Sequence, residues 1–204
     1  MFRLARILAL TSTASFLAVG AASAQSDENY GYGRTPTAVD LGLSVMWADH
    51  NVGADHPSEV GRLFGYGDVE GKETSNDMDK YVSGDISGTE RDPAYVYWGG
   101  GWRMPTQSEL EELQRRCKWK WVKNGKVAGF RVIGTNGRSI FLPVTGMKSN
   151  GNLQFADIRG YYWSGEMCGG GSSYVYALFF YNGNQLIKNY KKVYGFAIRP
   201  VKED

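Results

Sequence analysis

The sequence has few of the residues on which most catalytic and metal sites depend. It holds only two histidines and two cysteines among 204 residues, with no Cys-x-x-Cys pair. No serine lies in a nucleophile elbow, and no glycine string has the spacing of a phosphate-binding loop. We therefore expect a non-enzymatic protein without a cofactor.

Two small groups of polar residues are the remaining candidates for chemistry. His50 and His56 each follow an aspartate in DHNVGADH, but a six-residue gap across a glycine turn is not a recognised metal-ligand spacing. Asp68 and Glu70 share one glycine-rich loop, and a glycosidase pair would need a sugar cleft between them. We expect a polar surface turn and solvated loop acids, and no metal site.

The sequence also lacks an excess of charge and a membrane-spanning apolar run. Its 23 basic residues include Arg3 and Arg6, so the rest of the chain has 21 basic and 21 acidic residues. This balance argues against a nucleic-acid partner, because binding phosphates needs a basic excess. The apolar run at residues 7–19 is shorter than the ~20 residues that span a bilayer.

The first residues instead have the pattern of a targeting signal. Basic residues precede the apolar run, and Ala-Ser-Ala at residues 22–24 fits a small-residue cleavage site. We expect a signal peptide at 1–24, a flexible leader at 25–37 and one domain at 38–204. The mature chain would be exported to the periplasm, the cell surface or the medium, without membrane insertion after cleavage.

One helix and many short strands are predicted for this domain. Thr106 and Glu109 form a capping box, in which each side chain satisfies the other's backbone N–H. Leu110, Leu113 and Cys117 follow at helical spacing, which predicts one main helix over about 106–117. Residues 70–92 have no periodicity and are expected to form a long surface loop.

The predicted strands follow and precede this helix. WKWV, GFRVIG and SIFLPVTG are divided by KNGK and TNGR, and Asn-Gly is a strong hairpin signal. AVDLGLSVMWAD offers two brief strands around Gly42, and YGFAIRPV the last strand. The expected fold class is α+β, with short antiparallel strands and long loops.

The cysteines leave two alternatives open. Cys117 ends the predicted helix and Cys168 precedes the glycine run at 169–171. In an exported protein they would form a disulfide that ties the helix to this loop. The other interpretation is two separate buried thiols.

Several motifs in order resemble the Fibrobacter succinogenes major paralogous domain, which is common in exported bacterial proteins. They are VDLGLSVMWADHNVGA, LFGYGD, DPAYVYWGGGWRMPTQSELEEL, GRSIFLPVTG, GYYWSG and YGFAIRPV. The resemblance covers about residues 39–201. WRMPTQSEL is also similar to a segment of the formylglycine-generating enzyme superfamily. That similarity implies a C-type-lectin-like fold, with two small sheets, a flanking helix and termini close together.

The sequence departs from these relatives at their functional residues. A formylglycine-generating enzyme has a reactive cysteine pair in its C-terminal part, where this chain has only Cys168. The calcium-binding tripeptides of sugar-binding C-type lectins are absent from the chain. Neither sulfatase activation nor calcium-dependent sugar binding is therefore implied.

The C-terminal part also resembles the variable segment of proteins that retroelements diversify in gut-type bacteria. The changeable positions in that resemblance are Ala177, Phe179, Tyr181, Leu186, Asn189, Tyr190, Val193 and Tyr194. Such positions derive from an Asn codon by mutagenesis at adenines, while the third base stays a pyrimidine. Lys188 and Lys191 lie in the segment but cannot arise from an Asn codon in this way. A diversified binding protein is therefore one alternative.

The strand at 174–181 is apolar on both faces, so its periodicity fits burial on both sides. The family pattern favours Tyr176, Leu178 and Phe180 as core. We expect an exposed patch that binds a ligand, because tyrosines bury large areas at low entropy cost. Its predicted residues are Phe179, Tyr181, Lys188, Tyr190, Lys191 and Tyr194. The alternative is that each ring simply covers a loop.

The expected function is an exported ligand-binding or interaction module whose partner is an extracellular or envelope protein or a glycan. One alternative is a structural envelope protein, which would have no concentrated aromatic patch. Another is a sugar-active or formylglycine-generating-like enzyme, which the cysteine count and the acid residues disfavour. The tryptophans, including Trp119 and Trp121 of WKW, are expected to build the scaffold.

Overall fold

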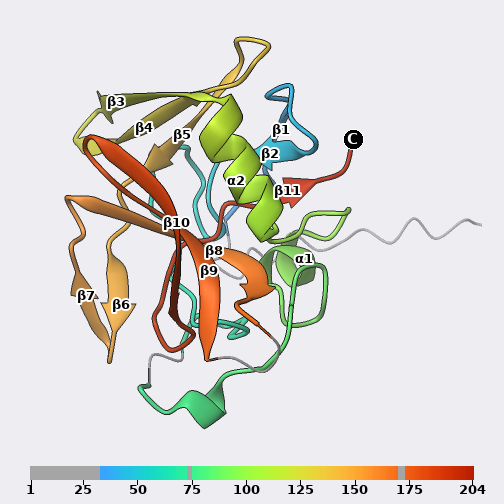
Figure 1. The fold of residues 1–204 in the computed structure, drawn as a ribbon, viewed down its shortest axis with the longest axis vertical. Coiled ribbons are helices and arrows are strands. Elements are labelled where there is room, and N and C mark those ends of the chain that lie inside the picture. Colours follow the sequence, from blue (N-terminus) through green and yellow to red (C-terminus); the bar gives the residue numbers. More distant parts are fainter. Residues whose placement is uncertain (1–32, 73–74, 170–172) are drawn as a thin grey trace, which may run out of the picture.

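Short antiparallel strands, rather than helices, make up most of the regular secondary structure (Figure 1). The computed structural model describes residues 33–72, 75–169 and 173–204. The predicted signal peptide and most of the predicted leader lie outside these ranges. Within them, no helix is long and apolar enough to cross a membrane.

The helices are α1 (Pro93–Trp98), α2 (Gln107–Arg116) and a 3-10 helix at Met78–Lys80. The strands are β1 (Ala38–Val39), β2 (Met46–Ala48), β3 (Lys118–Asn124), β4 (Val127–Ile133), β5 (Ser139–Pro143), β6 (Met147–Ser149), β7 (Asn152–Gln154), β8 (Arg159–Met167), β9 (Tyr174–Tyr181), β10 (Asn184–Lys191) and β11 (Val201–Lys202). This arrangement confirms the coarse prediction of small antiparallel sheets with few helices.

The strands form four small sheets. Their orders are β1-β2-β11, β3-β4-β5, β6-β7 and β10-β9-β8, and every strand pair is antiparallel. β11 pairs with β2, so the last strand joins the sheet that the first two strands form. Figure 1 shows α2 between this sheet and the β3-β4-β5 sheet.

The predicted helix and its capping box are confirmed. Thr106 Oγ1 accepts from the Glu109 backbone N–H at 3.2 Å, and the Glu109 carboxylate accepts from the Thr106 N–H at 2.8 Å. Leu110 and Leu113 are buried, as the helical spacing predicts. Arg103 donates to both oxygens of Glu109, and so couples the helix start to the preceding strand-like segment.

The predicted Asn-Gly hairpins are also confirmed. β3 pairs with β4 across the turn that contains Gly125, and β4 pairs with β5 across the turn that contains Gly137. Both glycines have positive φ, 62° and 85°, which a glycine adopts without steric cost. The brief strands expected around Gly42 are β1 and β2.

Two predictions of secondary structure were wrong. α1 is a second helix, begun by Asp92, whose carboxylate accepts from Ala94 N–H, with Pro93 at its first position. YGFAIRPV is mostly not a strand: only its last residue, Val201, belongs to β11. The rest forms single bridges, such as Phe196 with Phe64, because it crosses between several sheets.

β9 separates two hydrophobic clusters. It is the central strand of its sheet, and side chains alternate between the two faces. Leu178 and Phe180 lie in the cluster that includes α2, whereas Val175, Ala177 and Phe179 lie in the cluster on the other face. The strand is therefore buried on both faces. Its apolar sequence is compatible with this, but periodicity alone did not show whether one face or both are buried.

A buried arginine joins the segments around this core. Arg199 is 1% exposed and donates to Asn51 Oδ1 at 2.8 Å and to the Phe141 carbonyl at 2.9 Å. It also donates to the carbonyls of Ala48 and Asp49, both at 3.2 Å. Burial lowers the pKa of Arg199 to about 10, so the guanidinium stays charged at neutral pH.

Candidate functional site

The β3–β4 hairpin places two lysines beside a hollow. Side chains alternate along β3, so Lys123 shares a face with Trp121, whereas Lys120 lies on the opposite face. The Gly125 turn then reverses the chain, and Lys126 follows directly after it. Lys123 and Lys126 both line the hollow.

The β6–β7 hairpin and the loop after it form the facing wall. Lys148 lies on β6 and Leu153 on β7. Phe155 then has a φ of 55°, a left-handed conformation that turns the chain toward β8. The Arg159 guanidinium lies 4.0 Å from the centre of the Phe155 ring, a cation–π contact that holds the loop. Asp157 lies in the same loop.

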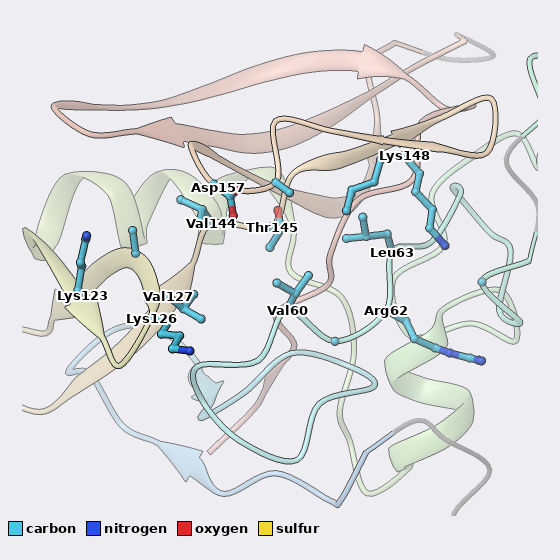
Figure 2. A pocket seen from close by; sticks show the side chains of 15 residues that line it. Val60, Arg62, Leu63, Lys123, Lys126, Val127, Val144, Thr145, Lys148 and Asp157 are labelled. Atoms are coloured by element: carbon cyan, nitrogen blue, oxygen red, sulfur yellow. The ribbon is translucent and has the colours of Figure 1, made fainter.

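The hollow between these two hairpins has a volume of about 650 Å³. Figure 2 shows Lys123 and Lys126 at one end of it. Arg62 and Lys148 lie at the opposite end (Figure 2). Its apolar lining residues are Val60, Leu63, Val127, Ala128, Val144, Leu153 and Ala156.

A second hollow, also of about 650 Å³, adjoins the first. Three aromatic residues line it: Trp121, Phe179 and Tyr181. Ile158, Arg159 and Asn182 complete the part that is not shared. The two hollows adjoin at the residues that they share, Lys123, Ala128 and Asp157, and we call the two together the basic–aromatic groove.

Positive charge dominates the basic–aromatic groove. Its cationic side chains are Arg62, Lys123, Lys126, Lys148 and Arg159. Arg62 donates to the Glu70 carbonyl at 3.2 Å. Within the ranges that the structure describes, the other four pair with no carboxylate. Asp157 is the acidic residue among those that line the groove, so a bound anion would meet a net positive site.

Exposed apolar side chains surround the same groove. Leu153 is 56% exposed, Ile158 55%, Tyr181 43% and Phe155 38%. Gathered apolar side chains of this size usually mark an interaction site, whereas isolated ones are ordinary. The groove therefore offers apolar contact and unpaired cations together, which suits a ligand with both anionic groups and apolar faces.

The structure does not bring the six predicted ligand residues together. Phe179 and Tyr181 line the aromatic part of the groove, and Lys188 Nζ lies 5.2 Å from the Phe179 ring centre. Lys191 and Tyr194 instead line a separate hollow of about 360 Å³ with Met78. Lys191 pairs with Tyr174 across the sheet, so it lies on the opposite face from Lys188.

The prediction of Phe179 as a surface residue was wrong. The side chain is only 8% exposed, and its ring centre lies 5.2 Å from that of Tyr161 and 5.8 Å from that of Tyr181. Both faces of β9 are covered along its middle, so the strand is exposed at its two ends, at Tyr174 and Tyr181. Tyr190 is half-buried, with its ring 5.2 Å from that of Phe196.

Both cysteines are free thiols, so the disulfide alternative is not found in the structure. Cys117 ends α2 and is buried, which raises the pKa of its thiol to about 11. Cys168 follows β8, where its sulfur accepts from Asn189 Nδ2 at 3.5 Å. The alternative of two buried thiols holds for Cys117 but not for Cys168, which is partly exposed.

We expected His50 to lie in a polar surface turn, but its side chain is buried and hydrogen-bonded. His50 is fully buried, with Nδ1 2.6 Å from Asp49 and Nε2 3.0 Å from the Arg34 carbonyl. These bonds tie the start of the described chain to the core. No group of three or more potential metal ligands occurs among the described residues.

The positions compared with a retroelement-diversified segment differ in exposure. Tyr181 and Asn189 are exposed, whereas Ala177, Phe179 and Val193 are 0%, 8% and 3% exposed. Changes at buried positions would disturb the core, so these three give the diversified alternative no support.

Lys123 and Lys126 were not predicted from the sequence as binding residues, because their segment also has the pattern of an ordinary hairpin turn. KNGK contains a turn signal, and charged residues beside a turn usually face solvent. The available signal was the alternation of WKWVK, which places Trp121 and Lys123 on one face. Their meeting with Asp157 depends on a loop more than 30 residues away, which no local pattern indicates.

No family model matches the chain, and no match was found among curated proteins or solved structures. Function is therefore inferred from the groove itself.

Proposed function

We propose that this chain is an exported, non-enzymatic binding module that takes a negatively charged ligand in the basic–aromatic groove. The observation that carries the proposal is a set of four cations, Lys123, Lys126, Lys148 and Arg159, around two adjoining hollows of about 650 Å³ each. None of the four pairs with a carboxylate in the part of the chain that the structure describes. A cation without a carboxylate partner keeps its charge available for an anionic ligand. The C-type-lectin-like fold and membership of the paralogous-domain family belong to this proposal.

The gathering of apolar residues supports binding over a purely structural role in the envelope. A structural protein has no need to expose Leu153, Ile158 and Tyr181 around one depression. The groove also supports a binding module over an enzyme, because its charged residues are several cations and one carboxylate, Asp157, a set that suits recognition of an anion. The mature chain has no net charge, so the local excess is a property of this site.

Charge reversal in the groove tests this function. Lys123→Glu combined with Lys126→Glu is expected to weaken binding of a soluble polyanion such as dextran sulfate at least tenfold, about 1.4 kcal/mol. Titration calorimetry at two salt concentrations measures both the affinity and its salt dependence, which should also fall.

Lys120→Glu is the matched control, because Lys120 lies on the same strand but on its other face. It should leave polyanion binding within about twofold of the parent. Equal losses in the control and the double variant, or no binding by the parent protein, would overturn the proposed function.

A further inference from the structure

We infer that the ligand is an acidic polysaccharide, which places its sugar rings against the aromatic hollow and its carboxylates against the lysines. This inference rests on the proposed function and adds the class of ligand. It is carried by the order of side chains along the groove: aromatic rings at one end, Asp157 and Lys123 in the middle, and further cations beyond.

The aromatic hollow has the features of a sugar-stacking platform. Tyr181 is exposed at the end of β9, and its ring lies beside that of Phe179. Trp121 is held in place by an edge-on contact with Phe130 at 5.0 Å and 81°. A fixed ring loses little entropy on binding, and its negative face attracts the C–H groups on the apolar face of a pyranose.

Asp157 distinguishes among the anions. A carboxylate in the middle of a basic groove repels phosphate, sulfate and carboxylate groups alike, but it accepts hydrogen bonds from hydroxyl groups. It therefore favours an anion that can place hydroxyl groups, rather than its charge, against Asp157. A uronate ring offers hydroxyl donors next to its own carboxylate. It can therefore donate to Asp157 while its carboxylate accepts from Lys123, which lines the same shared region.

The volume of the two hollows leaves room for more than one sugar. The two hollows have equal volumes of about 650 Å³ and meet at shared residues. A chain that spans both joins two contacts in one molecule, so the second contact forms at a high effective concentration. We therefore expect affinity to rise with chain length until both hollows are filled.

The experiment compares probes of matched charge on the full exported chain. Oligogalacturonates of two to eight units are titrated beside neutral dextrin oligosaccharides, polyglutamate and a single-stranded oligonucleotide. The acidic oligosaccharides should bind at least tenfold more tightly than the other three, with affinity increasing over the shorter lengths.

One variant and its matched control test the stacking contact. Tyr181→Ala should weaken oligogalacturonate binding about tenfold and leave polyglutamate binding within about threefold, because polyglutamate carries carboxylates but no sugar ring that could stack. Tyr174→Ala is the matched control, since Tyr174 has a similar exposure of 42% at the other end of the strand, outside the groove. Thermal unfolding of both variants checks that they remain folded.

The outcomes separate this inference from the proposed function. Groove-dependent binding of polyglutamate or the oligonucleotide in preference to oligogalacturonate would overturn the polysaccharide but keep an anion-binding module. Equal effects of Tyr181→Ala and Tyr174→Ala would also overturn it. If the parent protein bound none of the polyanions, both the polysaccharide inference and the proposed function would be overturned.

Discussion

At the scale of single residues, Arg199 is the clearest case of a charge used for structure. Its guanidinium is fully enclosed and donates to three backbone carbonyls and one side-chain oxygen, which come from two segments, residues 48–51 and β5. Removing it would leave buried acceptors unsatisfied, each at a cost of roughly 1–3 kcal/mol.

Arg199→Met is expected to lower the free energy of unfolding by about 3 kcal/mol or more. Urea titration followed by tryptophan fluorescence measures this loss. Arg138→Met is the matched control, because Arg138 is 66% exposed and lies 3.6 Å from Asp40. It should cost less than about 1 kcal/mol. A loss below that value for Arg199→Met would contradict the role described here.

Phe179 and Tyr181 have neighbouring rings but different exposure, so substituting each of them tests the burial of Phe179. Phe179→Ser should lower the free energy of unfolding by about 3–5 kcal/mol, because Phe179 is buried among Tyr161 and Tyr181. Tyr181→Ser should stay within about 1 kcal/mol, because that side chain is 43% exposed. Similar losses from both, measured by urea titration, would contradict the burial of Phe179.

At the scale of elements, the start of α2 combines a cap with an ion pair. Burial alone would raise the pKa of Glu109, but hydrogen bonds from Arg103 and Thr106 outweigh it and hold the pKa below its usual value of 4.5. A carboxyl group with a folded pKa below its unfolded pKa stabilises the fold above the unfolded value. That stabilisation is lost as the pH falls through the folded pKa.

Glu109→Gln isolates this effect, because glutamine can still complete the capping box but carries no charge. The parent protein should be more stable than the variant at neutral pH, and the difference should shrink below about pH 4.5. Urea titrations between pH 3 and 7 give the difference directly. A difference that stays constant across this range would show that the charge contributes nothing.

Local elements could be predicted from the sequence, whereas the contacts between elements that are distant in the chain could not. The capping box of α2 and the Asn-Gly turns depend on residues within one turn of each other. The burial of Phe179 depends on β8 and β10 covering both sides of β9, and the groove on two hairpins far apart in the chain. Asp92 and Pro93 did carry a local signal for α1, which was overlooked.

At the scale of the whole molecule, β11 joins the C-terminal part of the chain to the sheet formed by β1 and β2. Val201 pairs with Trp47 of β2, and Arg103 pairs with Glu203 beyond the strand. Removing residues 200–204 should therefore abolish cooperative unfolding, while removing Asp204 alone should change little. Circular dichroism during thermal unfolding measures both truncations. A cooperative transition without β11 would show that the sheet closes by other contacts.

The pairing of β2 with β11 also sets the order of events when the chain is made. A strand near residue 47 has to wait for a partner near residue 201, so the three-stranded sheet cannot be completed until residue 202 has been synthesised. Until then β1 and β2 form at most a two-stranded ribbon, which is marginally stable in water, so this part of the growing chain stays incompletely folded.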